Sequence, residues 1–358
     1  MTSATPPVLA LPEASDALSS RLAVGLERVE ALIVERTRNE DDFITEANLH
    51  LARAGGKRFR PVLTMLVAEL GEGIDDRVVA AAAGVELTHL ASLYHDDVMD
   101  EADLRRGAPS ANARYDNSTA ILVGDLLFGS ASDIIADLGP EAVKIQAQTF
   151  IRLCSGQIRD DRPCPEGADP REYYRGVLAD KTGVLVATAA RYGAMFGGCS
   201  PEVVAIATEY GERLGVAFQL ADDLIDIASL SGETGKTPGT DLREGKRTLP
   251  VLNALASDDP ADTADWIRRW REFDSAQDAL DVQITWVERR LPGFGAVALP
   301  QRVEVRGDRA IARIAGRAAH WEAMLARATD LLRLGPDESV LRLAAAATAP
   351  TWEKLSDA

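Results

Sequence analysis

The chain has 358 residues, of which 46% are apolar and 27% are charged, so it can bury one large core or two modest ones without disulfides. Its 39 Lys and Arg stand against 56 Asp and Glu, and the net charge of −17 argues against a surface that binds nucleic-acid phosphates. The three cysteines lack metal-binding spacing, and no run approaches the roughly 18 uninterrupted apolar residues of a membrane span. We therefore expect a cytoplasmic protein without nucleic-acid partners, whose contact with a membrane is limited to its surface.

Helical periodicity runs through most of the chain. Apolar or Ala-rich positions recur at steps of three and four in five segments: residues 18–33, 77–99, 118–137, 141–160 and 203–221. Breaks rich in Gly, Pro, Asp or Ser fall at residues 71–75, 107–109, 163–170, 197–201 and 231–245. No convincing strand pattern precedes residue 290. The sequence thus predicts an all-α bundle.

We expect a single domain over residues 1–358, because the chain shows neither an internal repeat nor a low-complexity linker. Residues 1–15 are expected to be disordered. Residues 258–317 are atypical, and the expectation there is a helix to about Arg290, then an irregular segment before a helix from His320 to Leu334.

The first acidic cluster occupies residues 95–100, His-Asp-Asp-Val-Met-Asp. On a helix Asp96 and Asp100 are one turn apart, about 5.4 Å along the axis, so both carboxylates project from one face. Like charges at this spacing need solvent, cations or a metal, and hard oxygen ligands favour Mg²⁺ shared with substrate phosphates. His89 lies seven residues earlier, nearly on the same face. Taken alone, the cluster also fits a solvated helix face.

A second cluster repeats this spacing. Asp222, Asp223 and Asp226 begin 126 residues after the first cluster (222 minus 96), again at the end of an apolar helix. Gln219 precedes them on the same helix, so a polar stripe runs down an apolar helix and must face water or a ligand. The repetition favours a metal site over a solvated face.

Basic residues gather near both clusters. They are Lys57, Arg58 and Arg60 beside a glycine pair, Arg105 and Arg106, Lys181, Lys236, and Lys246 with Arg247. Guanidinium and ammonium groups suit phosphate oxygens, whereas ordinary surface charge pairs stabilise little. The pattern indicates a magnesium-bridged diphosphate.

With these motifs the sequence resembles the trans-type polyprenyl diphosphate synthase family, and within it a long-chain member. The match runs from about Phe43 to Leu252 and is carried by residues 55–61, 86–107, 124–125, 181–183 and 218–250. The resemblance implies an isoprenoid synthase type of helical bundle around a central cavity, with the two aspartate-rich motifs facing across it. It also implies a homodimer and about three Mg²⁺ ions per active site.

The resemblance further implies a role for each matching residue. Asp96, Asp100 and Asp222 would bind Mg²⁺, supported by Asp97, Asp223 and Asp226. The allylic diphosphate would be held by Arg105, Lys181, Thr182, Lys236, Lys246 and Gln219. Isopentenyl diphosphate would be held by Lys57, Arg60, His89 and Arg106. The residues expected to act directly in catalysis are Asp96, Asp100, Asp222, Lys181 and Lys246.

The implied reaction is the head-to-tail (1′-4) condensation of isopentenyl diphosphate with an allylic diphosphate primer. Metal ions and cations stabilise the charge growing on the leaving group, and the alkene then attacks the allylic cation. The departed pyrophosphate is the expected base, so His95 is expected to pack or to support a metal ligand rather than to catalyse. The loop at residues 231–245 is the expected lid that excludes water.

Product length should depend on the small residues behind the first motif. Ala91, five residues before Asp96, stands where a bulky aromatic residue stops growth early in the resembling family. Ser92, Thr88 and Leu87 share these upstream turns. We predict a linear all-trans product longer than C20, with closure of the tunnel by Phe128 as the alternative.

Three other functions remain open at this point. A class I terpene cyclase shares the metal chemistry but does not need the second diphosphate site. A non-catalytic partner subunit of a prenyl synthase would be expected to lose acids, and all six are present here. A metal-dependent phosphohydrolase using His95 and Asp96 lacks a matching set of histidines.

Overall fold

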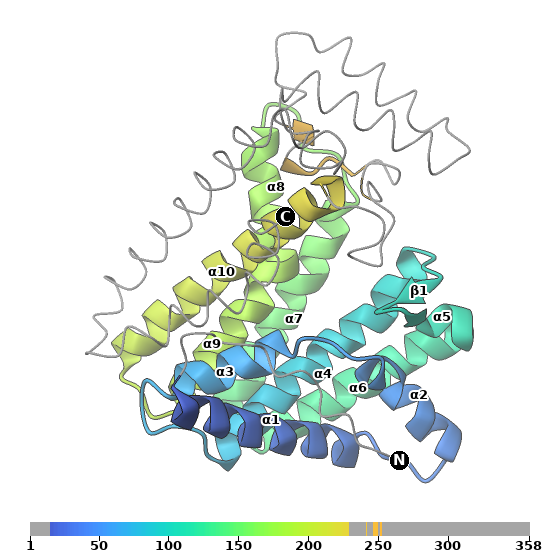
Figure 1. Ribbon diagram of the computed structural model, residues 1–358. Coiled ribbons are helices and arrows are strands. Elements are labelled where there is room, and N and C mark those ends of the chain that lie inside the picture. Colours follow the sequence, from blue (N-terminus) through green and yellow to red (C-terminus); the bar gives the residue numbers. More distant parts are fainter. Residues whose placement is uncertain (1–14, 229–240, 242–245, 250, 253–358) are drawn as a thin grey trace, which may run out of the picture. The chain divides into compact units, whose positions relative to one another are not determined.

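The computed structural model describes residues 15–228, 241, 246–249 and 251–252. Within them the elements follow in this order: α1 (Asp16–Arg36), α2 (Asp42–Arg53), α3 (Phe59–Ala68), α4 (Asp76–Met99), β1 (Leu104–Arg105), β2 (Ala108–Pro109), α5 (Ala111–Arg114), α6 (Asn117–Ala136), α7 (Pro140–Asp160), α8 (Pro170–Leu178), the π-helix η1 (Ala179–Gly183), α9 (Val184–Phe196) and α10 (Pro201–Ala228). This part is helical almost throughout (Figure 1), which confirms the all-α prediction. The predictions for Lys236, for most of residues 231–245 and for residues 258–317 fall outside the described residues.

Side-chain caps explain where several helices begin. Asp75 accepts a hydrogen bond from the Val78 amide (2.9 Å) at the start of α4. Asp116 accepts one from the Thr119 amide (2.8 Å) at the start of α6. These carboxylates satisfy amides that the first helical turn leaves unpaired. The predicted break at residues 71–75 thus ends at the residue that starts the next helix.

The chain forms two compact units. Of the described residues, 15–155 and 181–215 belong to the first unit, and 156–180 with those from 216 onward belong to the second. The boundaries fall inside helical segments, namely α7, η1 and α10. The expected single domain over residues 1–358 stays a prediction.

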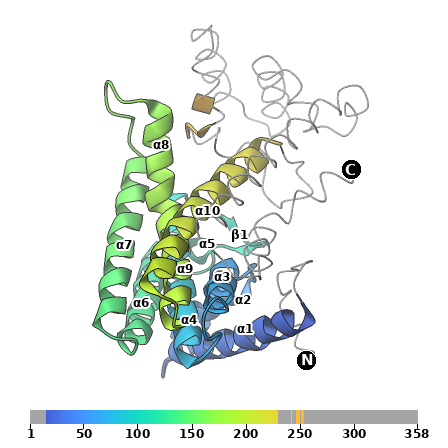
Figure 2. The same cartoon turned by 90° about the vertical axis from the view of Figure 1, so that its left-hand side faces the viewer.

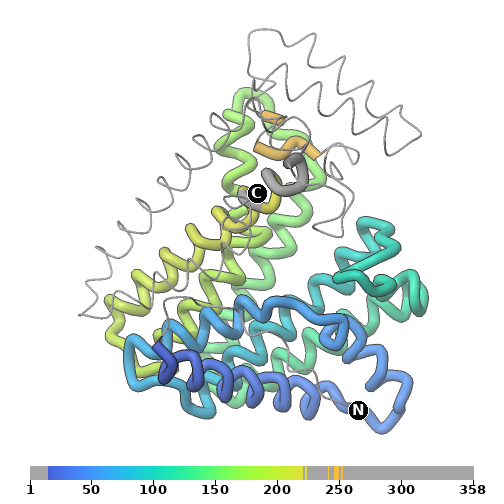
Figure 3. Tube along the Cα trace, in the orientation of Figure 1, coloured from blue at the N-terminus to red at the C-terminus, as the bar shows by residue number. Residues whose placement is uncertain are grey.

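Helix α4 forms the middle of the first unit's core. Its side chains are buried over most of the stretch from Val78 to Ala91. α6 runs beside it, and α3, α9 and α1 pack on it as well (Figures 1 and 2). α1 also lies along α3, as the Cα trace shows (Figure 3). A helix covered on several sides is apolar all round, so the acidic residues at its C-terminal end require a separate explanation.

A short β-hairpin follows α4, in a part of the chain where the sequence shows no convincing strand pattern. Strands β1 and β2 are antiparallel, with Arg105 paired to Ala108. The two turn residues, Arg106 (φ 55°) and Gly107 (φ 75°), both have positive φ, as a type I′ hairpin turn requires. Strands of two residues are too short for an alternating pattern to appear in the sequence. The hairpin matters because it carries Arg105 and Arg106.

Candidate functional site

The first acidic motif lies at the C-terminal end of α4, and its middle aspartate is held by the protein. Asp97 is 0% exposed. Its Oδ1 accepts a hydrogen bond from Nε of Arg105 (2.6 Å), and its Oδ2 accepts one from the Ala111 amide (3.4 Å). A buried carboxylate needs such donors because burial otherwise disfavours its charge. Asp97 therefore fixes the hairpin and α5 against the end of α4.

Asp96 and Asp100 are the more open carboxylates of this motif. Burial raises the pKa of Asp96 to about 6, with the Lys181 charge opposing this shift and the Asp100 charge adding to it. Asp100 caps α4 and is exposed, with Nη2 of Arg105 4.0 Å from its Oδ2. The motif thus presents two carboxylates near the cations Lys181 and Arg105.

These two carboxylates fit a divalent cation that is shared with a phosphate ligand. Among the described residues no group of three or more His, Cys, Asp or Glu side chains could hold a metal ion. Mg²⁺, however, commonly takes one or two carboxylates and completes its shell with water and substrate phosphate oxygens. A bound cation would also offset the burial that raises the Asp96 pKa.

Lys181 and Thr182 lie on the π-helix η1 between α8 and α9. Thr182 is buried, and Lys181 is partly buried and close enough to affect the Asp96 pKa. Single π-turns inside helices are frequent at functional sites. The sequence singled out both residues but gave no sign of the π-helix.

A cation cluster lies beside the first motif in the same unit. Arg60, Arg106 and His89 act on one another electrostatically, and Glu86 is the acid that acts on both arginines. Burial, with the Arg106 charge, lowers the pKa of Arg60 to about 10 although Glu86 opposes the shift. Nε of Arg60 is buried without a hydrogen-bond partner. The cluster therefore contains a buried donor that an acceptor oxygen of a ligand could satisfy.

Arg106 is placed by the glycine pair that precedes α3. Its Nη1 donates hydrogen bonds to the carbonyls of Leu51 (3.1 Å) and Gly55. Its guanidinium lies against Gly56, where a Cβ atom would come within 2.8 Å of Cζ. Gly56 also has φ +132°, which L side chains rarely adopt. The backbone conformation therefore favours glycine here, and a side chain would have to displace the Arg106 guanidinium.

Arg58 differs from its neighbours Lys57 and Arg60. Lys57 is exposed, whereas Arg58 is only 6% exposed and begins α3 in a left-handed conformation (φ 49°). It donates to Glu30, to Glu86 (3.4 Å), and to the carbonyls at the end of α2. These ion pairs outweigh burial and raise the pKa of Arg58. The sequence grouped all three cations together and missed Glu30 altogether.

His95 packs against α6 rather than extending the motif. Its Nε2 lies 3.3 Å from Oδ1 of Asp125 and 3.2 Å from the Ile121 carbonyl oxygen. Gly124 leaves the space for the ring, since a Cβ atom there would collide with it. This contact gives Gly124 and Asp125, which carry part of the family resemblance, a common role beside the His95 ring. It also supports the predicted packing role of His95.

The residues predicted to set product length lie on α4 within the first unit. Leu87, Thr88 and Ala91 are buried, and Ser92 is partly buried. Thr88 accepts a hydrogen bond from Gln146 of α7 (3.4 Å). The alternative stop, Phe128, is stacked on Phe150 with ring centroids 3.9 Å apart. Thr88 of α4 and Phe128 of α6 therefore both contact α7, through Gln146 and Phe150.

The second acidic motif lies on α10 in the second unit. Asp223 is 2% exposed, accepting hydrogen bonds from the Tyr174 hydroxyl (2.6 Å) and from Nε2 of Gln219 (3.2 Å). Burial raises the pKa of Asp223 to about 7 despite these two donors. Asp222 is partly exposed. Gln219, predicted to bind substrate, thus contacts Asp223, and the sequence gave no signal for Tyr174.

The remaining predicted residues are only partly described. Asp226 lies on α10, but its side chain is outside the described part of the chain. The Lys246 amide donates to the Asp241 carbonyl (2.8 Å). The first motif belongs to one unit and the second to the other, and their predicted meeting at one ligand stays a prediction.

The chain is similar to known proteins over most of its length. The family model "Polyprenyl synthetase" matches residues 41–283, and a second model, "Uncharacterized protein conserved in bacteria N-term", matches residues 247–358. Nonaprenyl diphosphate synthase of Mycobacterium tuberculosis is 50% identical over 243 residues, 68% of this chain and 72% of the relative.

Two solved structures are similar to this chain. The decaprenyl diphosphate synthase of Rhodobacter capsulatus has a TM-score of 0.76 and 32% identity, covering 96% of this chain and 99% of that one. A polyprenyl synthase of Caulobacter crescentus, complexed with calcium and isoprenyl diphosphate, has a TM-score of 0.75 and 28% identity, covering 95% and 98%.

The His89 environment predicts how stability depends on pH. Burial and the charges of Arg60 and Arg106 hold the pKa of His89 well below 6.5 in the folded chain. Below pH 6.5 the unfolded chain binds more protons at His89 than the folded chain does. The contribution of neutral His89 to the free energy of unfolding is therefore lost as the pH falls. Replacing His89 with Asn should make the free energy of unfolding fall less steeply between pH 7 and 5, by up to about 1.4 kcal/mol per pH unit. Denaturant unfolding at several pH values measures this, and parallel curves would contradict it.

Proposed function

Because this chain belongs to the polyprenyl synthetase family, a family of trans-prenyltransferases, we propose that it joins isopentenyl diphosphate head to tail (1′-4) to an allylic diphosphate. The product is a linear all-trans polyprenyl diphosphate longer than C20. The observation that carries this proposal is the cation cluster beside the first aspartate-rich motif, where the buried Nε of Arg60 has no hydrogen-bond partner. A diphosphate supplies the oxygens that such a cluster lacks.

Mg²⁺ is the metal of this proposal, about three ions per active site, held by Asp96, Asp100 and Asp222. Bound Mg²⁺ would stabilise negative charge on the departing pyrophosphate. The calcium in the Caulobacter crescentus structure supports a divalent cation in this family. Asp97, Asp223 and Asp226 support the ligands, and the hydrogen bonds of Asp97 and Asp223 agree with that supporting role.

The protein's own cations orient the two substrates. Arg105, Lys181, Thr182, Lys236 and Lys246 hold the allylic diphosphate and stabilise its leaving charge as the carbon–oxygen bond breaks. Lys57, Arg60, His89 and Arg106 hold isopentenyl diphosphate with its alkene toward the allylic carbon. Attack of the alkene forms the new carbon–carbon bond, and loss of a proton to the departed pyrophosphate restores a trans double bond.

One incubation tests this function. Purified protein with Mg²⁺, farnesyl diphosphate and labelled isopentenyl diphosphate should release chains longer than C20. Replacing Asp96 with Asn is the matched negative control, and its rate should fall by about 10²-fold or more because charge stabilisation in the transition state is lost. Cyclised hydrocarbon would indicate a terpene cyclase. Absence of label in the product would indicate a non-catalytic partner subunit, and both results contradict the proposal.

Product length follows from the small residue behind the first motif. The similar proteins named above make nonaprenyl and decaprenyl diphosphates by their names, which supports a long product. Ala91 is buried one turn from the motif, so a larger side chain there would fill space that a growing chain requires. Replacing Ala91 with Leu and then Phe should shorten the product stepwise, measured by chromatography of dephosphorylated products. An unchanged length distribution in a folded, active Phe variant would contradict this assignment.

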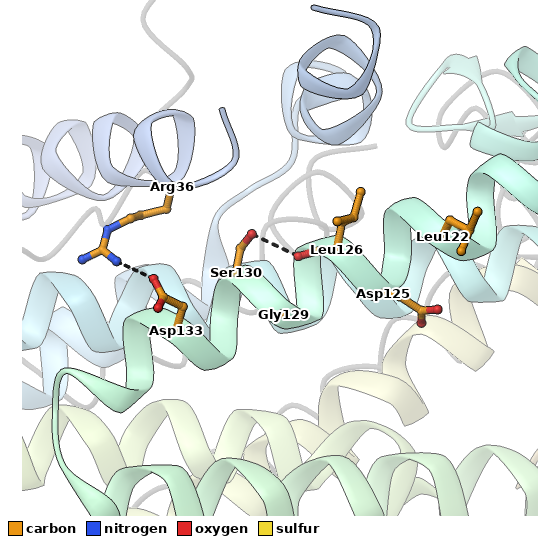
Figure 4. A pocket seen from close by; sticks show the side chains of 7 residues that line it. All are labelled: Arg36, Leu122, Asp125, Leu126, Gly129, Ser130 and Asp133. Carbon is orange, nitrogen blue, oxygen red and sulfur yellow. Dashed lines mark hydrogen bonds and ion pairs between the residues drawn. The ribbon is translucent and has the colours of Figure 1, made fainter. Parts of the chain in front are cut away.

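The outer face of α6 is where we place the homodimer interface. Leu122 is 61% exposed, and Ile121 and Leu126 are each 43% exposed. Leu122 and Leu126 border an open groove of ≈ 640 Å³ that also includes Gly129 and, from α1, Arg36 paired with Asp133 (Figure 4). An apolar helix face of this kind is a typical protein contact surface. A second copy of this chain is the expected partner.

Helix α6 is also long and apolar enough to cross a membrane by length and composition. Its other face, however, packs on α4 in the core of the first unit. We therefore propose a cytoplasmic dimer that touches membranes only peripherally when product is released.

Charge on the α6 face should separate the two copies. Replacing Leu122 with Asp should convert a dimer into a monomer by light scattering, because a carboxylate buried without a partner is strongly unfavourable. Val24 of α1 is similarly exposed (57%) and lies on another helix, so its replacement with Asp is the matched control and should leave the dimer intact. A monomeric wild-type protein, or a dimer that survives the Leu122 replacement, would contradict this interface.

A further inference from the structure

Two neighbouring tyrosines on α8 make different hydrogen bonds within the second unit. The Tyr173 hydroxyl donates to the backbone carbonyl of Arg159 (3.1 Å), near the end of α7. The Tyr174 hydroxyl donates to Oδ2 of Asp223 (2.6 Å), in the second acidic motif. These adjacent residues of α8 therefore bind two different partners. Only Tyr174 contacts a carboxylate of the second acidic motif.

Protein donors occupy both oxygens of the Asp223 carboxylate. The Tyr174 hydroxyl donates a hydrogen bond to Oδ2, and the Gln219 side-chain amide donates one to Oδ1 (3.2 Å). Both donors are neutral, so they fix the orientation of the carboxylate without placing an opposite charge beside it. The equivalent residue of the first motif, Asp97, instead receives its short hydrogen bond from a cation, Arg105 (2.6 Å). The two motifs therefore hold their middle aspartates by different means.

Asp222 directly precedes Asp223 on the same helical turn and is partly exposed. Groups that hydrogen-bond to or support metal ligands typically change metal affinity 10–100-fold when they are removed. A charge held in a fixed position beside a ligand attracts a divalent cation more strongly than one that can turn away.

We propose that Tyr174 is a positioning residue for the second motif, holding the Asp223 carboxylate in a fixed orientation beside Asp222, which binds the metal. This inference rests on the proposed function, in which Asp222 is a magnesium ligand. Tyr174 acts through Asp223 and does not itself touch substrate or metal.

Replacement of Tyr174 with Phe tests the inference because it removes one hydroxyl and keeps the ring. The Mg²⁺ concentration for half-maximal rate should rise about tenfold. The rate at saturating Mg²⁺ should return to near the wild-type value, and KM for isopentenyl diphosphate should not change. Replacement of Tyr173 with Phe is the matched control, since it removes the adjacent hydroxyl, and its Mg²⁺ dependence should match the wild type.

A general loss of structure would give a different result. It would lower the rate at every Mg²⁺ concentration and would affect the Tyr173 and Tyr174 variants alike, which would overturn the inference. Should the Tyr174 variant fail to fold, replacement of Gln219 with Met removes the other donor to Asp223 and should raise the Mg²⁺ requirement in the same direction. A wild-type Mg²⁺ dependence in that variant would also overturn it.

A binding measurement separates this inference from the proposed function. Titration with Mn²⁺ in the presence of inorganic pyrophosphate, followed by electron paramagnetic resonance, requires no turnover. Affinity about tenfold weaker in the Tyr174 variant than in the Tyr173 variant supports the positioning role even if the wild type elongates no substrate. Equal affinities overturn that role, and the proposed function then stands or falls on product formation alone.

Discussion

The structure of the first unit depends on how charge is tolerated at the end of an apolar helix. α4 is buried along most of its length and ends in three carboxylates, with several guanidiniums close by. Burying a charge is unfavourable by several kcal/mol unless a partner compensates it. The protein compensates some of these charges itself. Asp97 is paired with Arg105, and Arg58 is held by Glu30 and Glu86.

Other ionisable groups of the same region have shifted pKa values, which indicates that their charges are only partly compensated. Burial moves the pKa of Asp96 up to about 6 and that of Arg60 down to about 10, each toward its neutral form. A divalent cation would relieve the first shift, and an anion with several oxygens would relieve the second. A metal diphosphate supplies both together. The electrostatics of the first unit and the family membership therefore lead to the same class of ligand.

Much of the fold follows from local sequence patterns, and the exceptions have physical causes. Periodicity located the long helices because their buried faces repeat at the helical period, and the spacing of Asp96 and Asp100 located the motif. The β-hairpin could not be predicted because two-residue strands have no period. Composition could not distinguish Arg58 from Arg60. Arg58 is paired with Glu30 and Glu86, and these acids come from helices that are far from Arg58 in the sequence. Tyr174 gave no signal because its partner lies 49 residues away.

The most direct test of the account is a crystal structure with Mg²⁺, isopentenyl diphosphate and an allylic thiodiphosphate that does not react. Carboxylate oxygens of Asp96, Asp100 and Asp222 should lie about 2.0–2.1 Å from Mg²⁺ ions that coordinate one and the same diphosphate. The second diphosphate should contact Arg60 and Arg106. Metal ions that bind the two motifs separately, without a shared diphosphate, would contradict the central claim that both motifs act on one substrate.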